Sequence, residues 1–121
     1  MDKKKILVAD DEQSIRALVK RLLSDQYTVL EAGDGESAVS MAQAHRPDLV
    51  LMDIMMPKMD GYTACYAIKS DPVTRMIPVV MLTALDSELN RRLGEEVWGD
   101  DGYVTKPFSL QDLKHAISRF L

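Results

Sequence analysis

Five polar side chains follow apolar runs in this sequence, and their types suit phosphoryl chemistry. Asp10 and Asp11 come directly after the first run, and Asp53 ends the central run, which reads Leu-Val-Leu-Met-Asp. Thr83 and Lys106 follow two later runs of the same kind. A carboxylate beside so much hydrocarbon is costly to bury unless it is paired, so we expect Asp53 to have a partner.

The chemistry that these residue types allow is transfer of a phosphoryl group. A carboxylate is a competent nucleophile for this reaction and gives an aspartyl phosphate, and Asp53 is the central candidate. Three carboxylates in one pocket repel one another, and a hard divalent cation such as Mg²⁺ relieves that repulsion. The Lys106 ammonium and the Thr83 hydroxyl would then bind the phosphoryl oxygens.

These residues share a site only if the fold brings the ends of their strands together. Apolar, strand-like runs alternate five times with segments of helical spacing, which is typical of a parallel sheet with helices on both faces. The expected strands cover residues 6–9, 27–31, 49–53, 78–82 and 103–104. The expected helices run from Ile15 to about Asp25, from Asp34 to before Pro47, from Asp60 to Asp71, from Asp86 or Ser87 through Val97, and from Ser109, with a capping box to Asp112, through Phe120.

The alternation predicts an α/β fold with a single doubly wound, five-stranded parallel sheet. Right-handed crossovers favour the strand order 2-1-3-4-5 of flavodoxin-like proteins. In such sheets the ligand crevice lies at the carboxyl ends of the strands, where the strand order reverses between strands one and three. The length of 121 residues fits one domain, residues 1–121.

The composition excludes several classes of protein. A net charge of −4 argues against broad attraction to nucleic acid, so we expect no direct binding of DNA or RNA. Cys65 is the only cysteine, so no internal disulfide can form. The chain has neither a signal-peptide apolar region nor a segment long enough to span a bilayer. We therefore expect a cytoplasmic protein without membrane contact.

Four motifs occur in order along the chain, at the expected strand ends: Val8–Glu12, Leu51–Pro57 with Asp60 and Gly61, Leu82–Ala84, and Tyr103–Phe108. Each motif alone is weak, but the four together span essentially the whole chain. With them the chain resembles the response-regulator receiver domains of two-component signalling, of the chemotaxis-regulator type.

The resemblance implies a role for each candidate residue. Asp53 would take a phosphoryl group from a sensor histidine kinase or a histidine phosphotransferase. Mg²⁺ would be held by Asp10, Asp11, Asp53 and the backbone carbonyl of Met55. Thr83 and Lys106 would hold the phosphoryl oxygens.

The resemblance also implies a switch and an output surface. Tyr103 would turn inward when Thr83 moves toward the phosphate, and Lys106-Pro107 could adopt a cis bond. The fourth helix, fifth strand and fifth helix would bind an output protein or a second copy, with Arg91, Arg92, Trp98 and Asp100 on or beside that face. Such a domain is a regulator rather than an enzyme, and it assists only its own phosphorylation and dephosphorylation.

Two other functions remain as alternatives. An Asp-nucleophile phosphatase or phosphotransferase of the haloacid-dehalogenase kind carries a second Asp two residues after the nucleophile, where this chain has Met55. A flavin or nucleotide binder needs a phosphate-binding loop after the first strand, where Asp10-Asp11-Glu12 would instead repel phosphate.

Each residue also has a purely structural interpretation. Asp10 and Asp11 could cap the first helix, Thr83 could be a buried hydroxyl, Tyr103 could be static core, and Lys106 could extend from the sheet edge into water. Met52, Met55, Met56 and Met59 are expected to fill the core, Cys65 to be a small helix residue, and Asp100-Asp101 to form a solvated turn.

Apolar Met55 and Leu85 would flank the approach of water to the phosphorus, which predicts a long-lived phosphorylated form.

Overall fold

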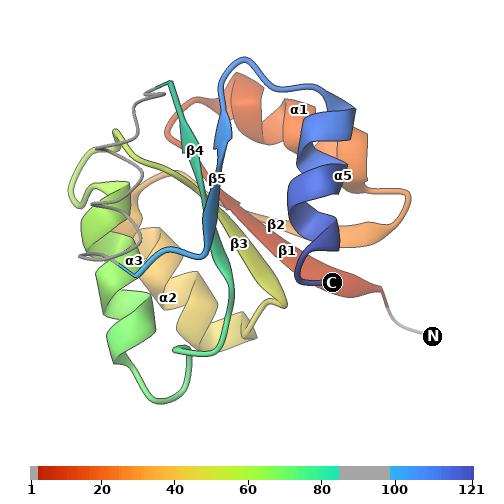
Figure 1. Cartoon of the computed structure of the whole chain (residues 1–121). Coiled ribbons are helices and arrows are strands. Elements are labelled where there is room, and N and C mark those ends of the chain that lie inside the picture. The colour runs from red at the N-terminus through yellow and green to blue at the C-terminus, as the bar shows by residue number, and fades with distance from the viewer. Residues whose placement is uncertain (1–2, 85–98) are drawn as a thin grey trace.

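The computed structural model describes residues 3–84 and 99–121, which form a parallel sheet between two layers of helices (Figure 1). The strands are β1 (Lys4–Ala9), β2 (Tyr27–Ala32), β3 (Leu49–Asp53), β4 (Val79–Thr83) and β5 (Gly102–Thr105). The helices are α1 (Gln13–Leu23), α2 (Gly35–His45), α3 (Gly61–Ser70) and α5 (Leu110–Ser118). The strand order is β2-β1-β3-β4-β5, which confirms the predicted topology.

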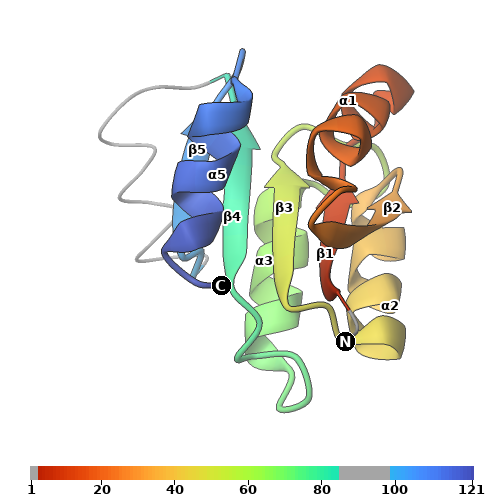
Figure 2. The same cartoon turned by 90° about the vertical axis from the view of Figure 1, so that its right-hand side faces the viewer.

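The two faces of the sheet carry separate halves of the core because neighbouring residues on a strand point in opposite directions. On β3, Val50 and Met52 pack with α2 and α3, whereas Leu49 and Leu51 pack with α1 and α5. Every residue of β3 and β4 is buried, as a central strand covered on both faces requires. Figure 2 shows α1 and α5 on one side of the sheet and α2 and α3 on the other.

Local sequence signals fix the helix starts close to where they were expected. The side chain of Asp34 accepts a hydrogen bond from the Ser37 N–H, and the Asp60 side chain accepts one from the Thr63 N–H. Ser109 begins α5 with the predicted capping box. The first helix ends at Leu23, two residues before the expected Asp25.

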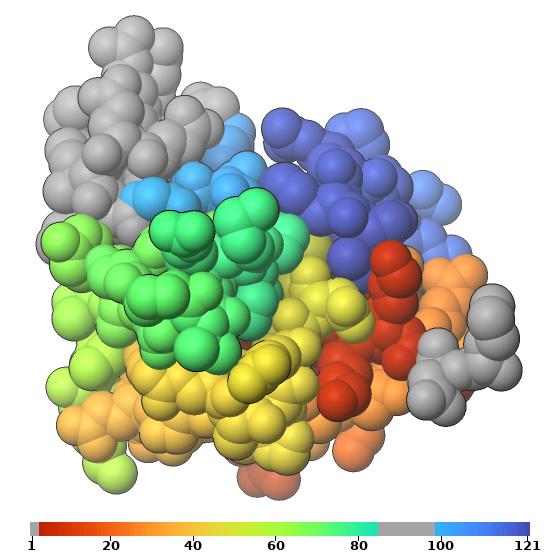
Figure 3. All heavy atoms as spheres, turned by 90° about the horizontal axis from the view of Figure 1, so that it is seen from below, coloured from red at the N-terminus to blue at the C-terminus, as the bar shows by residue number. Residues whose placement is uncertain are grey.

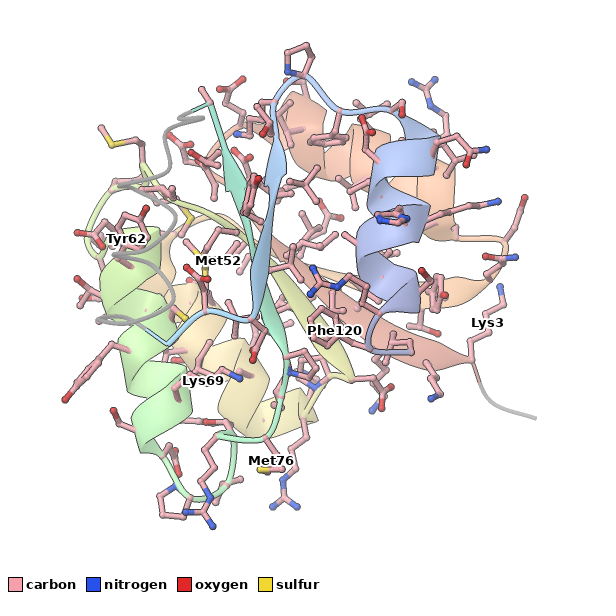
Figure 4. All side chains as sticks on the ribbon, viewed as in Figure 1. Lys3, Met52, Tyr62, Lys69, Met76 and Phe120 are labelled. Carbon is pink, nitrogen blue, oxygen red and sulfur yellow. The ribbon has the colours of Figure 1, made fainter. Side chains whose placement is uncertain are left out.

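Two structural expectations are wrong. Met55 does not fill the core, because 76% of its surface is exposed, although Met52 and Met56 are buried. Asp101 is not part of a purely solvated turn: its carboxylate is paired with the Lys69 ammonium of α3 and accepts the Val79 N–H. Lys69, labelled in Figure 4, also donates to the Ile77 carbonyl, so it ties α3 to the start of β4 and to the turn before β5.

The α2–β3 and α3–β4 connections lie at the end of the molecule that holds the amino ends of the strands (Figure 1). Figure 3 looks onto this end and shows the α3–β4 connection beside the α2–β3 connection and the start of β1. Exposed Met76 of the α3–β4 connection lies here (Figure 4). The helix expected from Asp86 or Ser87, and with it Leu85, Arg91, Arg92 and Trp98, lies outside the described residues.

Among the residues that the structure describes, no helix has the length and apolar character needed to cross a membrane.

Candidate functional site

The register of the sheet places the predicted residues at one edge. Ala9 pairs with Met52, so the residues that follow them, Asp10 just after β1 and Asp53 at the end of β3, lie side by side. Thr83 pairs with Thr105, and the Lys106 N–H that follows donates to the Thr83 carbonyl at 2.7 Å.

A cavity of about 530 Å³ opens at this edge. Its lining includes four of the predicted residues: Asp11, Asp53, Thr83 and Lys106. The exposed side chain of Met55 also lines it. Four of the five polar residues that the sequence singled out therefore line one solvent-accessible space, whereas the fifth, Asp10, is fully buried and is not among its lining residues.

Lys106 joins the two most buried carboxylates of the site. Its Nζ lies 2.9 Å from Oδ2 of Asp10 and 3.1 Å from Oδ1 of Asp53. Asp10 is fully buried and Asp53 is 8% exposed, so both charges need this partner. The alternative that Lys106 simply extends into water is wrong.

Asp10 is held from four directions. Its N–H donates to the Ala32 carbonyl at 3.0 Å, and its own carbonyl accepts from Arg16 at 2.6 Å. Its Oδ1 accepts the Glu12 N–H at 2.9 Å, and its Oδ2 binds Lys106. The N-cap of α1 is Glu12, so the alternative that Asp10 and Asp11 serve only as helix caps is wrong.

The loop after Asp53 is anchored by a close backbone approach. A Cβ on Gly61 would lie 2.0 Å from the Asp53 carbonyl oxygen, so only glycine fits there. The Gly61 N–H donates to the Ile54 carbonyl at 2.7 Å. Lys58 has a φ of 68° and pairs with the Asp34 carboxylate at 3.7 Å. These contacts fix the chain that carries Met55.

The electrostatics of the site leave an excess of negative charge. Burial raises the pKa of Asp53, the Lys106 hydrogen bond opposes this, and repulsion from Asp10 and Asp11 adds to it. Burial works to lower the pKa of Lys106, but its hydrogen bonds to Asp10 and Asp53 outweigh burial, so that pKa is raised. One ammonium thus stands against three carboxylates.

The donor set fits a hard divalent cation. Asp10, Asp11 and Asp53 each offer a carboxylate oxygen, and these oxygens all lie within 4.8 Å of one another. Mg²⁺ prefers oxygen ligands, and a dication would neutralise the charge that Lys106 leaves uncompensated.

Tyr103 lies on β5 and lines a second hollow, separate from the acidic cavity. It is half-buried and packs against the core on the α2 and α3 face. It also lines a groove of about 420 Å³ between β5 and α5, together with His115, Ala116 and Arg119. The Lys106-Pro107 bond that connects the groove to the acidic site is cis.

Sequence reasoning missed Arg16, which contacts the backbone of Asp10 and pairs with Glu31 of β2 at 3.2 Å. The available signal was weak: a cation six residues after Asp10, next to the inward-facing Ile15.

Comparisons with known proteins identify the family of this chain. Residues 6–118 match the response regulator receiver domain family. The chain belongs to this family. Receiver domains of response regulators act in two-component phosphoacceptor signalling and interact with histidine kinases, and theirs is a family of regulators rather than of enzymes.

Individual relatives of this receiver domain share both sequence and fold. A probable transcriptional regulator, ycf27 of Cyanophora paradoxa, is 45% identical over 100% of this chain and 49% of its own length. The chemotaxis protein CheY4 of Vibrio cholerae superposes with a TM-score of 0.91 at 32% identity, covering 98% of this chain and 99% of that one.

A third relative bears on the metal. The receiver domain of the sensor histidine kinase PA1611 of Pseudomonas aeruginosa has a TM-score of 0.87 at 30% identity, covers 98% of this chain and 97% of that one, and carries a magnesium ion in its active-site cleft. Nearly all of this chain matches curated relatives such as ycf27, but it spans only about half of their length.

Proposed function

We propose that Asp53 is the phosphorylation site of this receiver domain and that Thr83 and Lys106 bind the phosphoryl group. The observation that carries the proposal is the position of Asp53: a buried carboxylate at the end of a central strand, 3.1 Å from an ammonium and open to a cavity. A group so placed can be reached by a phosphodonor and is compensated from one side by Lys106.

The reaction is transfer from a phosphohistidine of a sensor histidine kinase or histidine phosphotransferase. An Asp53 carboxylate oxygen forms a bond to phosphorus while the nitrogen–phosphorus bond breaks, and the electron pair of that bond returns to the imidazole. Lys106 stays close to the oxygens on which charge develops, and the Thr83 hydroxyl donates to one of them. In this role the domain assists its own phosphorylation and later dephosphorylation and turns over no other substrate.

Asp10, Asp11 and Asp53, with the backbone carbonyl of Met55, are the residues that would hold Mg²⁺. When bound, Mg²⁺ offsets charge on the acidic side chains and on the phosphoryl oxygens. The spacing of the three carboxylates supports this assignment. Lys106 then becomes available to the phosphoryl group rather than to Asp10 and Asp53 alone.

Phosphorylation is proposed to act at a distance through Thr83 and Tyr103. Thr83 lines the acidic cavity, and Tyr103, on the neighbouring strand, lines the groove between β5 and α5. Movement of Thr83 toward the phosphoryl group would let Tyr103 turn inward and reshape that groove. An output protein or a second copy of the domain binds there, on a face completed by the fourth helix.

The remaining partners follow from charge and family. This domain binds no nucleic acid itself, because its net charge of −4 does not favour contact with phosphate backbones. It works in the cytoplasm, without membrane contact.

The test is phosphorylation by a small donor followed by intact mass. Wild-type protein with Mg²⁺ and acetyl phosphate should gain the mass of one phosphoryl group, and Asp53→Asn should not. Asp25→Asn is a matched control because Asp25 is exposed in the turn between α1 and β2, away from the site. An equal mass gain in Asp53→Asn overturns the assignment of Asp53, and steady release of phosphate from a phosphoester by wild-type protein favours the Asp-nucleophile enzyme.

A further inference from the structure

We infer that Arg16 is a positioning residue for the acidic site, one that holds the peptide between Asp10 and Asp11 and thereby sets the affinity for Mg²⁺. Arg16 belongs to α1 and touches none of the carboxylates proposed to bind the metal. The inference rests on the proposed function of those carboxylates.

The contact of Arg16 is with the backbone of the site. Its Nη1 donates to the Asp10 carbonyl oxygen at 2.6 Å. That carbonyl belongs to the planar peptide group that joins Asp10 to Asp11. Holding the peptide plane limits rotation on both sides of it, so one hydrogen bond orients two of the three proposed metal ligands.

The other side of the guanidinium is anchored. Nε of Arg16 donates to Oε1 of Glu31 on β2 at 3.2 Å, and the guanidinium packs over Gly33, 3.5 Å from where a Cβ would stand. The Arg16 side chain is only 18% exposed. A planar fork held between a strand and a loop is preorganised, which a flexible ammonium is not.

Lys20 supplies the comparison that separates position from charge. It lies one turn further along α1 and pairs with the same Glu31 carboxylate, at 3.8 Å, but it is 57% exposed. No contact with Asp10 is found for Lys20 among the described residues. The two side chains therefore carry the same charge on the same helix, and only Arg16 reaches the acidic loop.

If Arg16 acted only through its charge, replacing it would change the Mg²⁺ affinity in one direction; if it acts by positioning the peptide, the change has the opposite direction. Removing a cation near a cluster of carboxylates leaves that cluster more negative and should strengthen Mg²⁺ binding. Loosening the Asp10–Asp11 peptide should weaken it, because residues that orient metal ligands typically change affinity by about 10- to 100-fold. Since Arg16 acts on the backbone rather than on a ligand atom, we expect the lower end of that range.

The experiment is a calorimetric Mg²⁺ titration of the folded protein and three variants. Arg16→Gln should raise the dissociation constant about tenfold. Lys20→Gln, with the same charge change, should leave it unchanged or slightly lower. Arg16→Lys keeps the charge but cannot reach both the Asp10 carbonyl and the Glu31 carboxylate, so its dissociation constant for Mg²⁺ should lie between those of wild type and Arg16→Gln. It also takes the place of Arg16→Gln if that variant does not fold. Circular dichroism melts show that each variant is folded at the titration temperature.

A second readout separates Mg²⁺ affinity from a general loss of structure. The rate of phosphorylation of Arg16→Gln by acetyl phosphate should recover to near the wild-type rate at saturating Mg²⁺, which damage to the fold would not allow. A dissociation constant for Arg16→Gln, or for Arg16→Lys, no higher than that of Lys20→Gln overturns the inference about Arg16 alone. If the wild type shows no saturable Mg²⁺ binding, the proposed function fails as well.

Discussion

Replacing Asp53 with asparagine should make this protein more stable in the absence of metal, although the substitution removes the proposed phosphorylation site. Asparagine keeps the size of the side chain and an oxygen that can accept from Lys106, but it carries no charge. The variant therefore removes the repulsion between Asp53 and its acidic neighbours while leaving the packing of β3 intact.

The magnitude follows from the geometry of the site. Oxygens of the three carboxylates lie within 4.8 Å of one another, and at an effective dielectric constant of about 20 each pair repels by roughly 3.5 kcal/mol. Asp10 and Asp11 together then oppose the Asp53 charge by roughly 7 kcal/mol, and the Lys106 ammonium at 3.1 Å favours it by roughly 5 kcal/mol. The difference predicts a gain of about 2 kcal/mol in the free energy of unfolding, or roughly 8 °C in Tm.

The assay is urea and thermal denaturation in buffer with a chelator, then with Mg²⁺. Asp25→Asn removes one exposed charge far from the site, and its free energy of unfolding should stay within about 0.5 kcal/mol of wild type. With Mg²⁺ the difference in the free energy of unfolding between Asp53→Asn and wild type should shrink or change sign, because the wild type offers the ion one more charged ligand. An Asp53→Asn variant less stable than wild type without metal would refute the electrostatic account of the site.

The same prediction has a pH dependence whose sign is fixed. The pKa of Asp53 is raised in the folded protein, chiefly by burial, so the folded state binds the proton more tightly than the unfolded chain does. The cost of ionising Asp53 is fully present above its folded-state pKa and disappears as the pH falls below its unfolded-state pKa. The stability advantage of Asp53→Asn should therefore be largest near neutral pH and should vanish in acid.

The other predictions concern single side chains. Lys106→Met should lower the free energy of unfolding, measured in urea without metal, by about 3 kcal/mol, because it leaves two buried carboxylates without their cation. Mg²⁺ should restore part of the lost stability, and a loss under about 1 kcal/mol would contradict the pairing. Burial raises the pKa of Cys65 to about 12, so a disulfide reagent at mildly alkaline pH should label the thiol only after unfolding, and rapid labelling of the native protein would be inconsistent with its burial. Ser109→Ala breaks the capping box of α5 and should lower the free energy of unfolding, measured by thermal denaturation, by about 1 kcal/mol. An unchanged stability would mean that the cap does not stabilise the helix. Met55→Asn puts a polar group in the lining of the acidic cavity and should speed hydrolysis of the aspartyl phosphate, measured by loss of phosphorylated mass over time; an unchanged rate would count against an apolar barrier to water.

The sheet could be predicted because its signals are local and redundant. Every residue of β3 and β4 is apolar or ends the strand, and no helix pattern fits so short a run. Parallel strands must then place their carboxyl ends at one edge, which predicts that Asp10, Asp53 and Lys106 lie together. The caps at Asp34, Asp60 and Ser109 were equally readable, because each is set by residues within one turn of the helix.

What the sequence could not show depends on the direction of single side chains. Burial of Met55 is the natural expectation because methionine is usually in the core, but Met55 lies in the loop two residues after the end of β3 and is exposed. The pairing of Lys69 with Asp101 joins residues far apart in the chain, and neither has a neighbour in the sequence that indicates it. Contacts of this kind are set by the packing of α3 against the loops before β4 and β5, not by local preference.

The site departs from the rules that predict the rest of the chain, and the departure has a physical reason. Stable interiors avoid clusters of like charge, yet three carboxylates meet here with one ammonium between two of them. Lys106 compensates the buried pair only partly, so the metal-free site retains unfavourable energy that a dication or a phosphoryl–metal pair can relieve. The repulsion that lowers the stability of the metal-free protein therefore favours binding of the cation. This explains why the carboxylates, which are poorly suited to a core, lie together at the carboxyl ends of the strands.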